Sequence, residues 1–324
     1  MHTVFIVNPL AGAGAGARLA REIGTRRGDP WARAHVVQTH APGHAAELAR
    51  RALEEGARRV VSCGGDGTHR EVARGMLDEH GRPHCPDAVF SVVPCGTGND
   101  LVRTLGIPHD PARRFDHLID GPVRPMDAVA VELDGGDGRR LHTLSINVSD
   151  CGLGGEVIRR VNRSSRRLGG RACFLLATVA TLLTFRAPRV RLTADDRTLV
   201  ERDANLVVIG NARYAGGGMA VAPTADPTDG LLEIFVLGRF SLVTFLRRIR
   251  TLYRGDWVED PAVVHLRARQ VQVEADPPAA VGVDGENPGR TPAAFRILPA
   301  ALNVQWGVES GMSPCRRSER MSDS

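Results

Sequence analysis

Three short glycine-rich segments carry the residue types that suit binding of a phosphate-bearing ligand. Their sequences are Asn8-Pro9-Leu10-Ala11-Gly12, Gly64-Gly65-Asp66-Gly67-Thr68 and Pro94-Cys95-Gly96-Thr97-Gly98-Asn99-Asp100. Neighbouring glycines let backbone amides converge on an anion without side chains in the way, and a following helix presents its positive end. An aspartate in such a loop would repel phosphate unless a divalent cation lies between them, or unless the carboxylate orients a bound group.

Each segment also has a plain structural interpretation. The second would be a tight strand-to-helix turn with Asp66 as a cap, although so unusual a pentapeptide favours phosphate binding. In the third, Thr97 can donate a hydroxyl to phosphate, whereas Asp100 at a helix start is typical of a helix cap. The first segment, taken alone, is an ordinary turn.

The basic residues narrow the way in which a nucleotide could be held. The chain has no lysine, so all 42 of its basic residues are arginine. The Walker phosphate loop requires a lysine after its last glycine, so this chain cannot contain a standard Walker loop. Gly12, Gly14 and Gly16 do not form the dinucleotide fingerprint, because the third glycine comes one residue too early. A nucleotide would therefore be held by backbone amides, arginine, hydroxyls or a metal.

Length and charge limit the class of protein further. A chain of 324 residues is long enough for two domains. Its formal net charge of +5 is small for a nucleic-acid binder but compatible with an anionic membrane surface. We therefore expect no nucleic-acid partner.

Cysteine spacing and apolar runs predict the compartment. The six cysteines form no C-x-x-C pair, which indicates reduced thiols in a cytosolic protein without structural zinc. The N-terminus begins with a strand-like run, so we expect no signal peptide. The longest apolar run, residues 172–185, is too short to span a bilayer and is better explained as a buried or interfacial helix.

The elements that would position the three segments alternate between strand and helix. Apolar runs predict strands over 3–7, 34–38, 59–63 and 88–93, and helical patterns follow over 17–26, 44–55 and up to 78. Such alternation predicts a parallel sheet with right-handed crossovers, whose ligands bind at the carboxyl ends of the strands. All three glycine-rich segments fall at those ends.

After residue 125 the pattern changes to mostly strands. They are predicted over 128–133, 141–148, 189–193, 204–209, 231–236, 263–266, 271–274, 281–283 and 295–298, with helices over 156–185 and 242–253. The fold class predicted is an α/β domain over 1–125 and a β-rich, sandwich-like domain over 126–298. Residues 299–309 are expected to pack back on the first domain, and 310–324 to form a disordered tail.

Taken in order, these motifs resemble the diacylglycerol kinase catalytic domain family. The first three segments match its N-P-x-A-G, G-G-D-G-T and P-x-G-T-x-N-D motifs. Residues 147–155 are similar to its glycine-bearing strand end, and 211–223 to its N-x-x-x-x-G-G-G segment. Residues 227–232 are similar to its D-G-x-L motif, and 283–286 to its D-G-E motif. Sphingosine and ceramide kinases are related, and NAD kinases share the G-G-D-G part.

The resemblance implies roles for named residues. ATP would contact Asn8, Pro9, Leu10, Ala11, Gly12, Thr39, Gly64, Gly65, Asp66, Gly67, Thr68 and Thr97. Glu286 would be the base that takes the proton from a lipid hydroxyl, with Asp66 as a second catalytic residue. A structural magnesium would be bound by the side chain of Asp229 and the carbonyls of Asp226 and Leu231. Asp66, Asp100 and Asp127 would surround a catalytic Mg²⁺.

Two of these positions have a competing explanation, and one residue departs from the family. Asp284-Gly285 has the pattern of a hairpin turn, with Glu286 as an ordinary strand residue, and Asp229-Gly230 has the same explanation. Only the resemblance favours the catalytic role of Glu286. Arg70 stands where the family often has asparagine; it could contact a phosphate or face solvent.

The function that the resemblance implies is an ATP-dependent lipid kinase. Diacylglycerol is the first candidate substrate; a sphingoid-base or ceramide kinase, an NAD kinase and a non-catalytic nucleotide-binding regulator are alternatives. Arginines between Arg159 and Arg171 would form a solvated helix face or contact lipid headgroups. We expect a cytoplasmic protein, peripheral at the inner membrane surface, that could form a homodimer.

Overall fold

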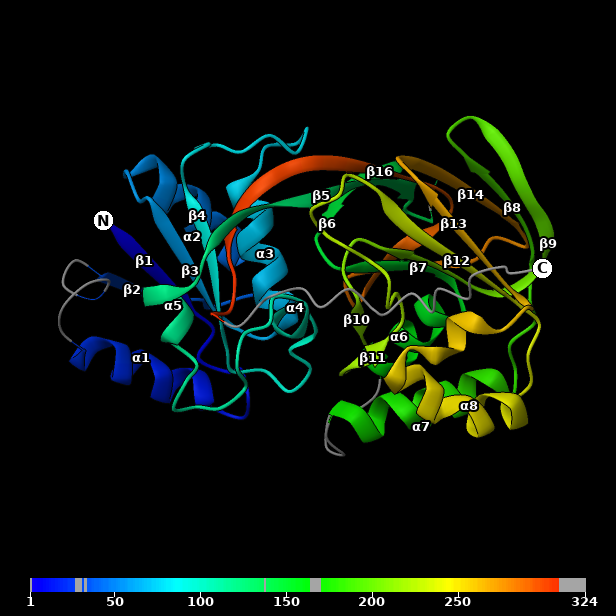
Figure 1. The fold of residues 1–324 in the computed structure, drawn as a ribbon, viewed down its shortest axis with the longest axis horizontal. Coiled ribbons are helices and arrows are strands. Elements are labelled where there is room, and N and C mark those ends of the chain that lie inside the picture. The colour runs from blue at the N-terminus through cyan, green and yellow to red at the C-terminus, as the bar shows by residue number, and fades with distance from the viewer. Residues whose placement is uncertain (1, 27–30, 32–33, 137, 164–169, 309–324) are drawn as a thin grey trace, which may run out of the picture.

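The chain folds into two lobes. Figure 1 shows them in a computed structural model of the protein. The structure describes residues 2–308 apart from 27–30, 32–33, 137 and 164–169. The predicted tail over 310–324 lies outside the described residues, as do Arg166 and Arg167.

The first lobe is built on four parallel strands in the order β4-β3-β1-β2. The strands are β1 (Thr3–Val7), β2 (Ala34–Gln38), β3 (Arg59–Gly64) and β4 (Val89–Pro94). The helices are α1 (Ala15–Thr25), α2 (His44–Glu54), α3 (Asp66–Met76), α4 (Asp100–Thr104) and α5 (Asp116–Asp120).

Helices cover both faces of this sheet. On one face Ile6 belongs to a buried cluster with Ala49 of α2, and on the other Phe5 belongs to a cluster with Leu19 of α1. Strands buried on both faces are apolar without alternation, which explains the unbroken run over 4–7.

The second lobe is mostly β. Its strands are β5 (Val123–Asp134), β6 (Arg140–Ser145), β7 (Val148–Gly152), β8 (Arg189–Ala194), β9 (Arg197–Gly210), β12 (Leu232–Gly238), β13 (Val263–Ala268), β14 (Gln270–Asp276), β15 (Ala280–Val283) and β16 (Glu286–Gln305), with a small pair β10 (Tyr214–Ala215) and β11 (Met219–Ala220). Its helices are α6 (Leu153–Arg163), α7 (Gly170–Leu182), α8 (Leu242–Arg254) and the 3₁₀ turn η2 (Asp256–Glu259). The predicted fold class is therefore confirmed.

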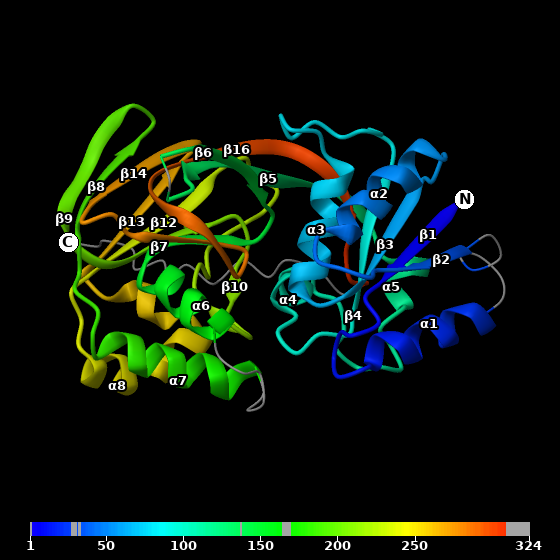
Figure 2. The same cartoon turned by 180° about the vertical axis from the view of Figure 1, so that it is seen from behind.

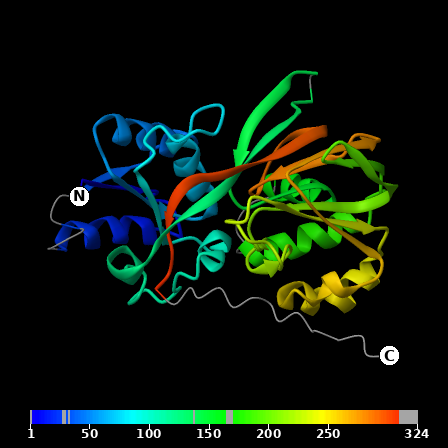
Figure 3. The same ribbon diagram turned by 45° about the horizontal axis from the view of Figure 1, so that its top comes forward.

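Two long strands, β5 and β16, belong to both lobes. They pair antiparallel along most of their length. Near the end of β16, Asn303 and Val304 pair in parallel with Val89 and Phe90 of β4. In the described part of the chain this produces one continuous 14-stranded sheet, and Figure 3 shows both strands passing from one lobe to the other.

The single strand predicted over 141–148 is wrong in one respect, because it is divided into β6 and β7. The backbone amides of Ile146 and Asn147 donate to the carboxylate of Asp284 at 2.9 and 3.0 Å. Amides used in this way are not available to a neighbouring strand, so the ladder is interrupted there.

The strand predicted over 295–298 is the middle of the much longer β16. The prolines of this region argue against an extended strand on sequence grounds. The structure accommodates Pro292 and Pro299 at two register shifts, between Arg290 and Ala293 and between Leu298 and Leu302.

The helices α6, α7 and α8 lie on the same side of the second lobe, as the two opposite views show (Figures 1 and 2). Among the described residues, no helix is both long and apolar enough to cross a membrane.

Candidate active site

The second and third glycine-rich segments touch backbone to backbone. The amides of Cys95 and Gly96 both donate to the carbonyl oxygen of Gly64, at 2.9 and 3.0 Å. A Cβ atom added to Gly96 would lie 2.6 Å from the Cα atom of Gly65. Only glycine permits so close an approach, which explains why both segments carry it.

The first segment joins the other two. Gly12 has a φ of +57°, and a Cβ atom there would lie 2.0 Å from the carbonyl oxygen of Cys95. The side-chain amide of Asn8 donates to the hydroxyl of Thr68 at 3.2 Å. Thr39, which follows β2, donates its amide to the carbonyl oxygen of Val7. The structure thus brings the three segments together at the carboxyl ends of their strands.

Other residues of these segments differ in exposure. The side chains of Leu10 and Thr97 are exposed, whereas Pro9 and Ala11 are half-buried and Thr68 is buried. Leu10 is held in its turn by its amide, which donates to the side-chain oxygen of Asn8 at 3.0 Å.

The N-terminus of α3 lies within this junction. Gly65 is its N-cap residue and provides no side chain to cap the helix. Gly67 in the first turn is exposed, and a Cβ atom there would meet open space. The first amides of a helix lack intrahelical partners and carry partial positive charge, so this end of α3 is suited to an anion.

Asp66 caps the next helix along the chain. Its Oδ1 accepts hydrogen bonds from the amides of Asp100 and Leu101 at 2.8 and 3.2 Å, which stabilises the start of α4. Its Oδ2 faces Gly98, where a Cβ atom would lie 2.6 Å away. The cap predicted for Asp100 is therefore made by Asp66.

Asp100 instead connects the lobes. Its two carboxylate oxygens accept from the amides of Gly217 and Gly218 at 2.9 and 2.6 Å. Burial, and then the negative charge of Asp66, raise the pKa of Asp100 to about 6. The G-G-G tract of the second lobe thus supplies amides to a carboxylate of the first.

Asp127, which lies in β5, also uses its carboxylate to join distant segments of the chain. Its two oxygens accept from the amides of Ala300 and Gly230, both at 2.7 Å. Burial raises the pKa of Asp127, and the nearby charge of Asp226 acts in the same direction. Asp127 therefore holds the β16 bulge against the loop before β12.

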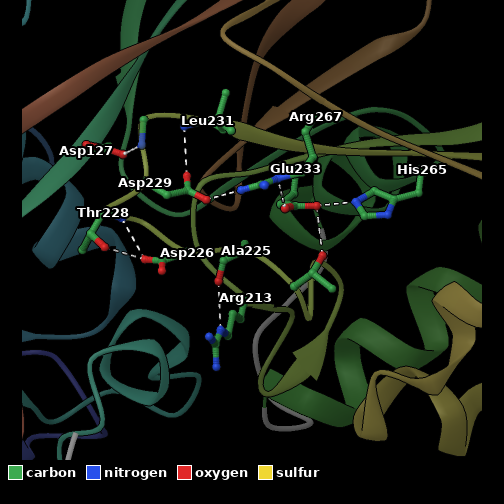
Figure 4. Close-up of polar contacts among 12 residues, drawn as sticks. Asp127, Arg213, Ala225, Asp226, Thr228, Asp229, Leu231, Glu233, His265 and Arg267 are labelled. Carbon is green, nitrogen blue, oxygen red and sulfur yellow. Dashed lines mark hydrogen bonds and ion pairs between the residues drawn. The ribbon is translucent and has the colours of Figure 1, made fainter. Parts of the chain in front are cut away.

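That loop carries the predicted metal ligands (Figure 4). Asp226 Oδ1 accepts from the amide and hydroxyl of Thr228, at 3.0 and 2.7 Å. Asp229 Oδ1 accepts from the amide of Leu231 at 3.0 Å, and its Oδ2 pairs with Arg267. Arg267 also contacts the buried carboxylate of Glu233 at 2.7 Å.

These contacts limit where a cation would fit. No group of three or more His, Cys, Asp or Glu side chains that could hold a metal occurs within the described ranges. Both oxygens of Asp229 are already engaged, one by an amide and one by a guanidinium. Asp100 and Asp127 are engaged by amides as well, which leaves Asp66 Oδ2 as the better-placed carboxylate oxygen for a cation. The magnesium predicted at the Asp229 side chain and the carbonyls of Asp226 and Leu231 stays a prediction.

Glu286 begins β16 directly after a tight turn. Asp284 and Gly285 have φ angles of 46° and 82°, as a two-residue hairpin requires. The hydroxyl of Ser145 donates to Asp284 at 2.6 Å, which anchors the turn. Glu286 itself forms an ion pair with Arg70 of α3, so it reaches across to the first lobe.

Sequence reasoning missed several of these partners. The resemblance covered Gly217 and Gly218 without giving them a role, and Arg70 was left unassigned. Arg267 was not singled out at all. A charged residue alternating with apolar ones in β13 is typical of any exposed strand, so no signal in the sequence distinguished Arg267.

Comparisons with known proteins agree with this architecture. Residues 2–131 match the model of the diacylglycerol kinase catalytic domain, and 147–306 match the YegS C-terminal NAD kinase beta sandwich-like domain. A diacylglycerol kinase of Mycobacterium tuberculosis is 31% identical over 303 residues, covering 92% of this chain and 93% of that protein. A Pseudomonas aeruginosa protein named "Probable lipid kinase YegS-like" is 31% identical over 269 residues, 83% of each chain.

A solved structure also shares the fold. The crystal structure of a diacylglycerol kinase from Bacillus anthracis str. Sterne superposes with a TM-score of 0.67 at 21% identity. The match covers 94% of this chain and 96% of that one, so both lobes are included.

Proposed function

This chain belongs to the diacylglycerol kinase and YegS-like family of lipid kinases, and we propose that it transfers the γ-phosphoryl group of ATP to the hydroxyl of diacylglycerol. The product would be phosphatidic acid. The observation that carries the proposal is the junction of three glycine-rich segments at the uncapped start of α3. Phosphoryl transfer depends mainly on positioning and charge stabilisation, and this junction offers amides for both.

Glu286 is the proposed base. More than half of its side chain is exposed, so a substrate hydroxyl can reach it from solvent. As the hydroxyl oxygen forms its bond to the γ-phosphorus, its proton passes to the Glu286 carboxylate. The bond between the γ-phosphorus and the bridging oxygen breaks, and its electron pair leaves with ADP.

Magnesium would bind at this site mainly to the phosphates of the nucleotide. Mg²⁺ is commonly held by one or two carboxylates together with substrate phosphates and water, and it neutralises phosphate charge when bound. Asp66 is the residue that would hold it, because its Oδ2 faces the third glycine-rich segment. Asp66 also fixes the start of α4, so one side chain would join the two segments.

A lipid-panel assay tests the proposal. Purified protein is incubated with labelled ATP, magnesium and one acceptor: diacylglycerol, a sphingoid base or ceramide in vesicles, or NAD in solution. We expect labelled phosphatidic acid, and we expect Glu286→Gln to lower kcat to a small residual rate while ATP binding by calorimetry is retained. Glu274→Gln, an exposed glutamate of β14, is the matched control and should behave as wild type. Label found only in the sphingoid base, ceramide or NAD would refute diacylglycerol as the acceptor.

We further propose that α8 brings the enzyme to the cytoplasmic face of an anionic membrane. None of its residues is buried. Its outward face combines Val243 and Leu246, which are 57% and 49% exposed, with Arg247, Arg250 and Arg254. Apolar and arginine side chains on one helix face are typical of interfacial helices. A kinase whose acceptor resides in a bilayer needs such a contact.

A further inference from the structure

One buried cation at the site, Arg70 of α3, has no role in the scheme above. Its side chain is only 5% exposed, and its Nη2 contacts Glu286 Oε1. Its Nε is inaccessible to solvent and has no hydrogen-bond partner among the described residues. A buried donor without a partner costs free energy, so stability alone is a poor explanation for an arginine here.

The position of Arg70 links the phosphate-binding junction to the proposed base. Arg70 lies four residues after Asp66 in α3, so both project from the same face of the helix. Glu286 comes from the other lobe, where the Asp284-Gly285 turn fixes only its backbone. The guanidinium is thus the contact that ties the Glu286 side chain to the lobe that would hold ATP.

We propose that Arg70 is a positioning residue for Glu286. It holds the carboxylate at a fixed place beside the start of α3, so that a lipid hydroxyl lies between the base and the γ-phosphate. The inference rests on the proposed function. The contact engages Oε1, which leaves Oε2 to accept the proton, and the guanidinium remains protonated throughout the transfer.

Substitution of Arg70 by asparagine, the residue that the related family often has there, tests this role. Asparagine is too short and uncharged to hold Glu286, so we expect kcat to fall on the order of 10²-fold, the effect of a misplaced group. KM for ATP should be unchanged, because the contact lies away from the amides that bind phosphate. Arg70→Lys should recover part of kcat, since it keeps the charge but loses the planar fork.

Two comparisons separate positioning from a general structural effect. Arg74→Asn changes an exposed arginine one turn further along α3 and should leave kcat as in wild type. In a Glu286→Gln background, Arg70→Asn should cause no further loss, because the carboxylate that it positions is already absent. Equal losses in both backgrounds, or an unchanged kcat in Arg70→Asn, would overturn the inference.

A measurement without turnover distinguishes failure of this inference from failure of the proposed function. Denaturant unfolding of wild type, Arg70→Asn, Glu286→Gln and the double variant gives the coupling between the two side chains. We expect non-additive unfolding free energies. Additive effects would show that the two side chains do not interact, which would overturn the inference even if lipid is phosphorylated. A wild-type protein that phosphorylates no lipid but shows coupling would refute the proposed function alone.

Discussion

Arg267 provides the positive charge that the acidic cluster beside β12 requires. It pairs with Asp229 and with Glu233, whose side chains are 25% and 3% exposed, and His265 contacts Glu233 as well. A guanidinium that spans two carboxylates offsets their repulsion as a bound cation would. The family resemblance assigns this place to a structural magnesium, whereas in this structure Arg267 already supplies a positive charge to Asp229.

Chelation therefore should not destabilise the nucleotide-free protein. We expect the melting temperature of wild type to be the same with EDTA as with Mg²⁺. Arg267→Ala should lower the unfolding free energy by roughly 1–3 kcal/mol, less than a fully buried pair because Arg267 is 46% exposed. In this variant Mg²⁺ should restore part of the loss. A wild-type melting temperature that falls on adding EDTA would contradict the expectation.

Asp150 of β7 is a carboxyl that the proposed reaction does not use. Glycines make room for it beneath α6: a Cβ atom on Gly154 would lie 2.3 Å from its Oδ1, and one on Gly282 would lie 2.4 Å from its Oδ2. Its Oδ1 has no partner in the part of the chain that the structure describes. Burial raises the pKa of Asp150 to about 7.

This shift predicts a pH dependence of stability. Because the folded state holds the proton more tightly, the stability from Asp150 is complete below its unfolded pKa near 3.9 and is lost as pH rises through about 7. The slope is at most about 1.4 kcal/mol per pH unit. Asp150→Asn, which mimics the protonated form, should match wild type only below about pH 4, and its higher melting temperature should become more marked from there to about pH 7 and stay constant above. Parallel melting curves across this range would show that Asp150 does not titrate there.

Residue pairs were the part of the site that sequence reasoning could not supply. The ion pair of Arg70 with Glu286 joins α3 to β16, and that of Asp229 with Arg267 joins the loop before β12 to β13. Such pairs depend on how distant elements pack, and nothing in the local sequence encodes them. Glycines are different, because the close approach of Gly65 and Gly96 leaves a trace in the residue type itself.

At the scale of elements, α8 packs one face against the second lobe and exposes the opposite face. Leu242, Phe245, Ile249 and Leu252 are half-buried at helical spacing and form its inner stripe. Ser241 caps its start by accepting from the amide of Thr244 at 3.2 Å. The helix is therefore folded without a membrane, and the proposed contact with lipid headgroups requires no rearrangement of its outward arginines.

Vesicle flotation tests that surface. Replacing Arg247, Arg250 and Arg254 together by serine should weaken binding to anionic vesicles on the order of 10²-fold, since each arginine contributes about 1 kcal/mol near such a membrane. A matched triple substitution of exposed arginines on the β8–β9 hairpin should retain binding; these are Arg189, Arg191 and Arg197. Equal flotation of both variants would exclude α8 as the membrane contact.

Most elements could be predicted, because their signals are local. The apolar runs of β1 to β4 and the helical spacing of α8 agree with the structure within a few residues. β16 could not be predicted as one strand, because its residues Pro288, Pro292 and Pro299 argue against a continuous strand. The break between β6 and β7 was also hidden, since the acceptor is Asp284, far along the chain.

At the scale of the whole molecule, the two lobes share a sheet instead of meeting at a linker. The boundaries predicted at 125 and 298 fall inside β5 and β16. Asp100 and Asp127 add contacts between segments on either side, through Gly217, Gly218 and Ala300. Any opening of the space between the lobes must therefore bend the two strands or break these bonds.

The arrangement of β16 has a consequence for biosynthesis. The strand that begins with Glu286 also ends by pairing with β4, so it closes the sheet of the first lobe with residues translated after those of every other described strand. While a ribosome is still translating the preceding residues, the nascent polypeptide has its glycine-rich segments but neither Glu286 nor the last neighbour of β4. Completion of the fold and the arrival of Glu286, the proposed base, therefore coincide, and a chain that ends before β16 has neither.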